Sequence, residues 1–117
     1  QFGPALWNRM LDQCLKSAAA ELAFVVDEDG LVVAWRGAAD SSISEGIGAR
    51  LVIAFEQAAQ MADVGSTSQS IAIEFGDRWL TGIRIRRKDN HVFTVGVLSP
   101  SVVTREVRRT MEKIIQH

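Results

Sequence analysis

The chain has 117 residues, of which 47% are hydrophobic and 23% are charged, and this mixture is typical of a globular domain. Most domains hold roughly 100–150 residues, so we expect residues 1–117 to form a single domain. The formal net charge of −1 does not favour binding to nucleic acid or to an anionic membrane. No apolar run approaches the ~20 residues that a membrane span needs. The single cysteine, Cys14, excludes an internal disulfide and favours a reducing, cytoplasmic location.

Charge is unevenly distributed along the chain. Residues 1–60 carry a net charge of −4, whereas residues 61–117 carry a net charge of +3. Either this is ordinary variation along one domain, or it marks a basic surface patch near the second half of the sheet.

The first predicted element is an amphipathic helix. Apolar residues follow the spacing i, i+3, i+4, i+7 from Trp7 to Ala18, and Pro4 suits the first turn of such a helix. Cys14 lies within this apolar stripe. We therefore expect Cys14 to be a buried core thiol rather than a nucleophile.

Two β-rich segments, 22–26 and 31–35, flank an acidic turn that runs from Asp27 to Gly30. This pattern predicts a β-hairpin, because Asp tolerates turn geometry and Gly supplies a positive φ. Both segments are continuously apolar, so each is predicted to be covered on both faces of its sheet. The carboxylates of the turn lack the spaced ligands of a calcium loop, and we expect no metal there.

Residues 42–64 form the longest predicted helix. Ser42 and Glu45 match a capping box at its start, and Gly65 follows its end. Its apolar residues fill an arc of about 180°, whereas packing on one sheet needs about 100°. A second internal layer or a second molecule would explain the excess, and few elements remain to form a layer. Gly48 lies within the arc and permits close approach of another backbone.

Three segments with period-2 alternation, 69–75, 78–86 and 92–98, are separated by short turns and predict an antiparallel meander. Ser99-Pro100 is predicted to open a last helix, with Ser99 as its cap. The complete order is helix, two strands, helix, three strands, helix. We therefore predict an α+β fold with one five-stranded antiparallel sheet and helices on both faces.

No catalytic constellation is found in the sequence. The histidines, His91 and His117, belong to no metal-spaced cluster, and Gly46 and Gly48 lack the rest of a dinucleotide fingerprint. We therefore expect no metal, no cofactor and no active site of the protein's own. The basic segment from Arg84 to Lys88 lacks interleaved aromatic side chains, so it favours a solvated edge or a protein-docking patch over nucleic acid.

The segment from Glu21 to Trp35 resembles the first hairpin of the roadblock/dynein-light-chain family. In that family an apolar strand runs into an acidic D-x-D-G turn and then into a Leu/Val-rich strand. The order of the later elements matches the family too, so the resemblance covers about residues 5–115. It implies a fold similar to profilin and longin domains. It also implies that this protein is a non-catalytic regulator or scaffold of a small Ras-like GTPase. Such a regulator is at most GTPase-activating and is not itself an enzyme.

Members of this family usually dimerise by pairing the third strand and the long helix with their symmetry mates. In this chain the third strand is expected to be an apolar edge, an aggregation hazard that a two-fold dimer removes. We therefore predict a homodimer; the family also forms heterodimers. The predicted interface comprises Val52, Phe55, Ala59, Ile71, Ala72, Ile73 and Phe75.

Two long helices side by side are expected to dock the switch region of the GTPase. The predicted partner-binding residues are Glu45, Ala49, Arg50, Ile53, Glu56, Gln57 and Gln60. Arg50 is also a candidate arginine finger in trans. Two alternatives stay open. A structural adaptor would use the same surface, and a small-molecule sensor would need an apolar cavity with a few convergent polar groups.

Overall fold

The computed structural model describes residues 4–37, 41–61 and 70–116, with the backbone alone at 4, 41–45, 59, 61, 75 and 116. Its elements are α1 (Pro4–Ala18), β1 (Leu22–Val26), β2 (Val32–Gly37), α2 (Ser41–Met61), β3 (Ser70–Phe75), β4 (Arg78–Arg86), β5 (Val92–Ser99) and α3 (Arg105–Gln116). The strands form one antiparallel sheet in the order β2-β1-β5-β4-β3. The predicted α+β fold and its order of elements are confirmed.

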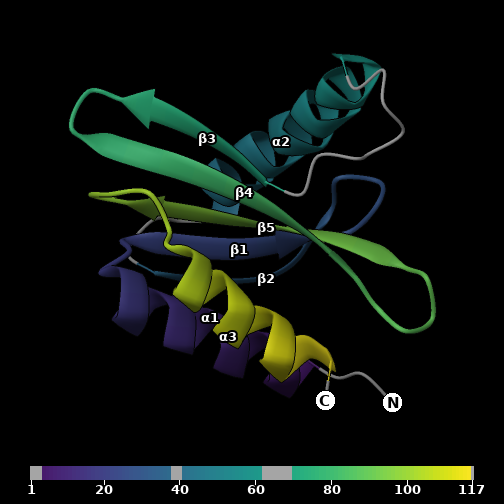
Figure 1. The fold of residues 1–117 in the computed structure, drawn as a ribbon, viewed down its shortest axis with the longest axis horizontal. Coiled ribbons are helices and arrows are strands. Elements are labelled where there is room, and N and C mark those ends of the chain that lie inside the picture. Colours follow the sequence, from purple (N-terminus) through teal and green to yellow (C-terminus); the bar gives the residue numbers. More distant parts are fainter. Residues whose placement is uncertain (1–3, 38–40, 62–69, 117) are drawn as a thin grey trace.

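Different helices cover the two faces of the sheet (Figure 1). Helices α1 and α3 pack together on one face, and α2 crosses the other. Strand β1 lies inside the sheet and all five of its residues are buried. Ala23 and Val25 face α1 and α3, whereas Phe24 and Val26 face α2. The prediction that this apolar segment is covered on both faces is therefore confirmed.

The same prediction is wrong for β2. Among the described strands, β2 lies at an edge of the sheet and pairs with β1 alone. Its register shifts between Val25 and Val26, which leaves Val33 as the extra residue of a β-bulge. Leu31 is 66% exposed and Val33 is 42% exposed. An edge strand has a neighbour on one side only, so its apolar residues are less completely covered than those of β1.

The larger core lies between the sheet and helices α1 and α3. Trp7 packs against Phe93 with ring centroids 4.9 Å apart. Cys14 is 0% exposed, and this burial raises the pKa of its thiol from 9.0 to about 12. The expectation of a buried core thiol is therefore confirmed.

The last helix begins later than predicted. Ser99 pairs with Trp79 in the sheet, and its hydroxyl donates a 2.6 Å hydrogen bond to the Ser101 carbonyl. Helix α3 begins at Arg105, and the Oγ1 of Thr104 accepts a 3.3 Å hydrogen bond from the backbone N–H of Val107. Thr104 is thus the helix cap. Ser99, which was predicted to be the cap, is instead part of β5.

Candidate protein-interaction site

Helix α2 approaches the sheet closely at two glycines. A Cβ at Gly48 would lie 2.5 Å from Cγ1 of Val26, and a Cβ at Gly82 would lie 3.0 Å from Cδ2 of Leu51. The close neighbour of Gly48 is therefore a side chain of the protein's own β1, and not another backbone as predicted. Leu51 and Phe55, each 2% exposed, form the side of α2 that is buried against the sheet.

The sheet covers only part of the apolar arc of α2. Ile47, Val52, Ala54 and Ala58 are half-buried, and Ile53 is 55% exposed. An exposed isoleucine beside several half-buried apolar side chains leaves apolar surface in contact with water. The outer side of α2 can therefore gain stability by packing against another molecule.

Strand β3 is the second edge of the sheet. It pairs with β4 on one side, with Ile73 opposite Leu80. Ile73 is 38% exposed and Ile71 is half-buried. The prediction that the third strand lies at an edge is confirmed, and its apolar residues are accessible there.

An apolar hollow of about 150 Å³ lies where α2 meets the β3–β4 pair. Its lining residues are Ile47, Arg50, Leu51, Ala54, Ile73 and Leu80. Arg50 is exposed, and its Nη1 donates a 3.3 Å hydrogen bond to the carbonyl oxygen of Gly46. The hollow joins the exposed side of α2 to the free edge of the sheet. One molecule could therefore contact both.

The predicted partner-binding residues all belong to α2. Six of them are exposed: Ala49, Arg50, Ile53, Glu56, Gln57 and Gln60. The seventh, Glu45, lies outside the described side chains, as does the predicted capping box that it forms with Ser42. The structure thus brings these six side chains to the water-facing surface of one helix.

The predicted dimer-interface residues are not all brought together. Ile71, Ala72 and Ile73 lie on the free edge of the sheet. Val52 and Phe55 instead line a pocket on the other flank of α2, and Phe55 belongs to the protein's own core. Ala59 and Phe75 were also predicted to lie at the interface, and their side chains lie outside the described part of the structure. The flank of α2 that faces β3 carries Ile47, Arg50 and Ala54.

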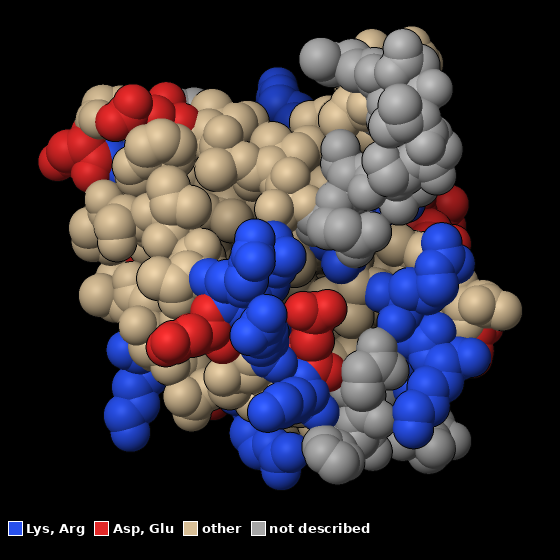
Figure 2. Space-filling view, in the orientation of Figure 1, with Lys and Arg blue, Asp and Glu red and all other residues tan. Residues whose placement is uncertain are grey.

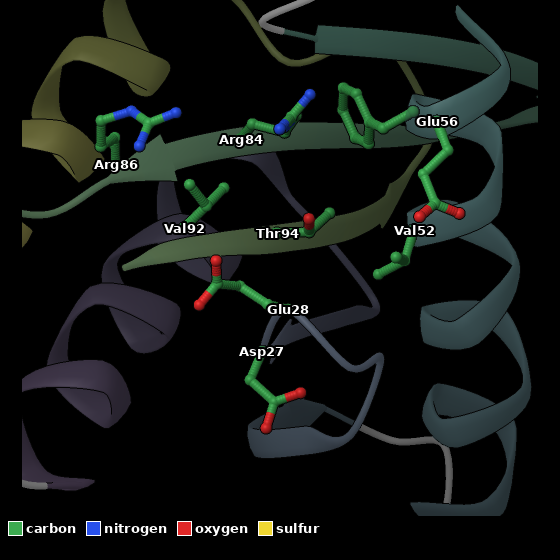
Figure 3. A pocket seen from close by; sticks show the side chains of 9 residues that line it. Asp27, Glu28, Val52, Glu56, Arg84, Arg86, Val92 and Thr94 are labelled. Atoms are coloured by element: carbon green, nitrogen blue, oxygen red, sulfur yellow. The ribbon is translucent and has the colours of Figure 1, made fainter. Parts of the chain in front are cut away.

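The pocket on that other flank has a volume of about 310 Å³ (Figure 3). Its lining residues are Asp27, Glu28, Val52, Phe55, Glu56, Arg84, Arg86, Val92 and Thr94. The guanidinium carbon of Arg84 lies 5.5 Å from the centroid of the Phe55 ring. Nδ1 of His91 lies 3.2 Å from Oε1 of Glu28, which links the β4–β5 turn to the β1–β2 turn.

Sequence reasoning missed this pocket, because its lining comes from α2, β4, β5 and the first hairpin turn. The only signal was that alternation places Arg84 and Arg86 on one face of β4. Five of the nine lining residues carry a charge. The pocket is therefore a poor match for the apolar cavity that the small-molecule sensor requires.

Within residues 4–37, 41–61 and 70–116, no group of three or more His, Cys, Asp or Glu side chains is arranged to hold a metal ion. No helix in the described part of the chain is both long enough and apolar enough to cross a membrane.

Neither a protein-family model nor a curated protein sequence matches this chain. Its structure is similar to gliding protein mglB from Thermus thermophilus, with a TM-score of 0.76 and 12% identity over 98% of this chain and 93% of that chain. For the roadblock/LC7 domain from Streptomyces avermitilis the TM-score is 0.68, with 13% identity over 92% and 86%. Profilin IA from Acanthamoeba castellanii gives 0.59, with 15% identity over 92% and 90%. This protein therefore has the fold of a roadblock/LC7 domain, as its sequence predicted.

Proposed function

We propose that the protein is a non-catalytic, homodimeric interaction domain of the cytoplasm that binds a small Ras-like GTPase and regulates or scaffolds it. The observation that carries the proposal is the exposed side of α2 lying beside the unpaired edge of β3, with an apolar hollow between them. The roadblock/LC7 fold supports it, because the family resemblance implies this role.

The proposed dimer pairs β3 with β3 of a second copy about a two-fold axis. Such pairing removes the free edge and continues the sheet across both protomers. It would also cover Ile73 and the flank of α2 that carries Ile47 and Ala54. The proposed interface therefore keeps Ile71, Ala72 and Ile73 and replaces Val52 and Phe55 with this flank. A monomer in sedimentation at tens of micromolar would contradict the dimer.

The GTPase would dock on the outer sides of the two α2 helices. Binding shifts a GTPase between its conformations only if the affinity for the two states differs. Affinity capture with the full chain, with GDP and a GTP analogue supplied in parallel, measures that difference. Enrichment of a small GTPase in one nucleotide state supports regulation. Equal capture in both states favours the structural adaptor.

Two matched variants locate the docking surface. Ile53→Asp places a charge on the outer side of α2, at a residue that is 55% exposed. Val102→Asp places the same charge between β5 and α3, at a residue that is 41% exposed. We expect Ile53→Asp to abolish capture and Val102→Asp to preserve it. Equal capture by both variants would place the docking site elsewhere.

Arg50 tests whether the domain contributes to GTP hydrolysis. Its guanidinium is exposed, but it is hydrogen-bonded to its own helix at Gly46. If Arg50 acts as an arginine finger, Arg50→Ala should reduce stimulated turnover by roughly 10³-fold or more. Unchanged stimulation would leave only repositioning of the GTPase's own residues.

A further inference from the structure

Charge is segregated between two parts of the molecule, although the net charge is only −1. Helices α1 and α3 and residues 87–91, which we call the basic pole, hold eight of the thirteen basic side chains and four of the fourteen acidic ones. The remaining segments hold five basic and ten acidic side chains. The basic pole thus has a formal charge of +4 and the rest of the chain −5.

Part of the basic pole faces the viewer in Figure 2. Lys and Arg side chains gather there over α3 and around the β4–β5 turn, with some acidic side chains beside and between these two groups. These elements lie far apart in the sequence and are brought together by the fold. The net charge of the chain therefore conceals a surface that attracts anions.

Helix α3 carries a row of cations that its own packing does not explain. Arg105, Arg109 and Lys113 repeat every four residues, are exposed and make no ion pair within the described part of the chain. Like charges at this spacing repel one another and weaken a helix. The buried residues Met111 and Ile115 hold the opposite side of α3 on the core. Stability of the fold therefore does not require the row.

We infer that the basic pole binds the surface of a lipid bilayer that contains anionic lipids. Its cations stand on long, flexible side chains, and they belong to a pair of helices that covers one face of the sheet and to the β4–β5 turn (Figure 1). A bilayer offers many laterally mobile single charges and requires no fixed register. Each Lys or Arg near such a surface adds a similar increment of binding.

A bilayer fits this surface better than a polynucleotide does. Single strands are bound by basic grooves with aromatic side chains on which the bases stack. On this side of the sheet Trp7 is 2% exposed, and Phe93 is half-buried against it. Among the described residues no aromatic side chain is exposed.

The position of the basic pole leaves the proposed GTPase surface free. Helix α3 and α2 lie on opposite faces of the sheet (Figure 1). A dimer through β3 would present two α3 helices on the same side. Bilayer binding does not require the GTPase, and the Ile53→Asp capture experiment fails or succeeds independently of it.

Flotation with vesicles tests the inference directly. Vesicles of phosphatidylcholine with about 30% phosphatidylglycerol should bind the full chain at about 0.1 M salt, and pure phosphatidylcholine should not. Binding should fall steeply at about 0.5 M salt, because exposed charges are then screened. Equal binding to both kinds of vesicle, or no binding to either, would overturn the inference.

Two variants with the same change of net charge locate the contact. The triple variant Arg105→Gln, Arg109→Gln and Lys113→Gln should bind on the order of a hundredfold more weakly. The control variant Arg78→Gln, Arg84→Gln and Arg86→Gln neutralises three cations of β4 that lie outside the basic pole and should bind like the parent. Equal losses in both variants would overturn the assignment to the basic pole.

Competition identifies the anionic surface. Polyuridylate or polyglutamate is added in an amount whose total negative charge equals that of the vesicle lipids. The protein should then stay bound to the vesicles. Displacement by either polymer would overturn the bilayer as the target, in favour of RNA or an acidic protein. Circular dichroism of both variants tests whether they are folded. The salt dependence of the unmodified chain provides the test should either variant fail to fold.

Discussion

The protein covers the two faces of its sheet to different extents. Among the described residues, thirteen buried side chains form the core beneath α1 and α3, with Met10, Leu11 and Met111 at 0% exposure. Fewer buried apolar side chains lie beneath α2, namely Leu22, Phe24, Val26, Leu51, Phe55 and Leu80, and Ile53 and Ile73 remain 55% and 38% exposed there. Two helices close the first face, whereas a single helix leaves part of the second uncovered.

This difference separates stability from recognition. Burial of apolar area supplies most of the favourable free energy of folding, so the face beneath α1 and α3 should dominate stability. The face beneath α2 keeps apolar surface beside a free strand edge, so it is the face suited to protein partners. The outside of α1 and α3 carries exposed Lys and Arg side chains, which suits the proposed anionic surface.

The largest expected effect comes from truncating the well-covered core. Met111 is 0% exposed, so Met111→Ala should lower the free energy of unfolding by about 2–5 kcal/mol. Ile53→Ala, at an exposed position on α2, should change it by less than about 0.5 kcal/mol. Urea unfolding followed by circular dichroism measures both. Equal losses of unfolding free energy would show that the two faces contribute equally to stability.

Two glycines of α2 test how tightly that helix lies on the sheet. A Cβ at Gly48 would lie 2.5 Å from Val26, so Gly48→Ala should destabilise the protein by about 1–3 kcal/mol. Among the described side chains, a Cβ at Gly46 would meet only Nη1 of Arg50, at 3.5 Å. Gly46→Ala should therefore stabilise the protein by up to about 1 kcal/mol, through helix propensity. Thermal unfolding of both variants would reveal the opposite signs, and a gain at both positions would mean that α2 sits loosely.

The two edge strands offer a matched pair for the dimer. Ile73→Lys on β3 and Val33→Lys on β2 each place a cation at an exposed apolar position of an edge. We expect Ile73→Lys to give a monomer and Val33→Lys to leave the dimer intact, because a lysine on an edge opposes strand pairing. Each should change monomer stability by less than about 0.5 kcal/mol. Sedimentation velocity measures the assembly, and a dimer of Ile73→Lys would rule out the proposed β3 interface.

The smallest effect concerns Cys14 and appears only at high pH. Its pKa is raised from 9.0 to about 12 in the folded protein, so unfolding releases a thiol that ionises more readily. The resulting stabilisation is fully present below pH 9 and is lost as the pH rises toward 12. Cys14→Ala should therefore lose less unfolding free energy between pH 7 and pH 10 than the parent. Rapid reaction of the native thiol with a disulfide reagent at pH 7 would contradict its burial.

Local patterns predicted the type and order of all eight elements. Apolar periodicity indicated the three helices and the last three strands, and an acidic turn between two apolar runs indicated β1 and β2. Local patterns also predicted the burial of Cys14 and the full cover of β1. The same apolar pattern failed for β2, because a strand's place at the edge depends on which strands pair. Ser99-Pro100 was misassigned as a helix start because the pairing of Ser99 with Trp79 is not visible in the local sequence.

The sequence by itself determined the type and order of the elements and the apolar excess of α2, since these follow from residues close together in the chain. Only the tertiary structure decided which flank of α2 meets β3, and so removed Val52 and Phe55 from the strand edge. It alone brought the cations of α1, α3 and residues 87–91 to one side of the molecule. Helix orientation and charge clustering depend on contacts between distant segments, and no local pattern encodes them.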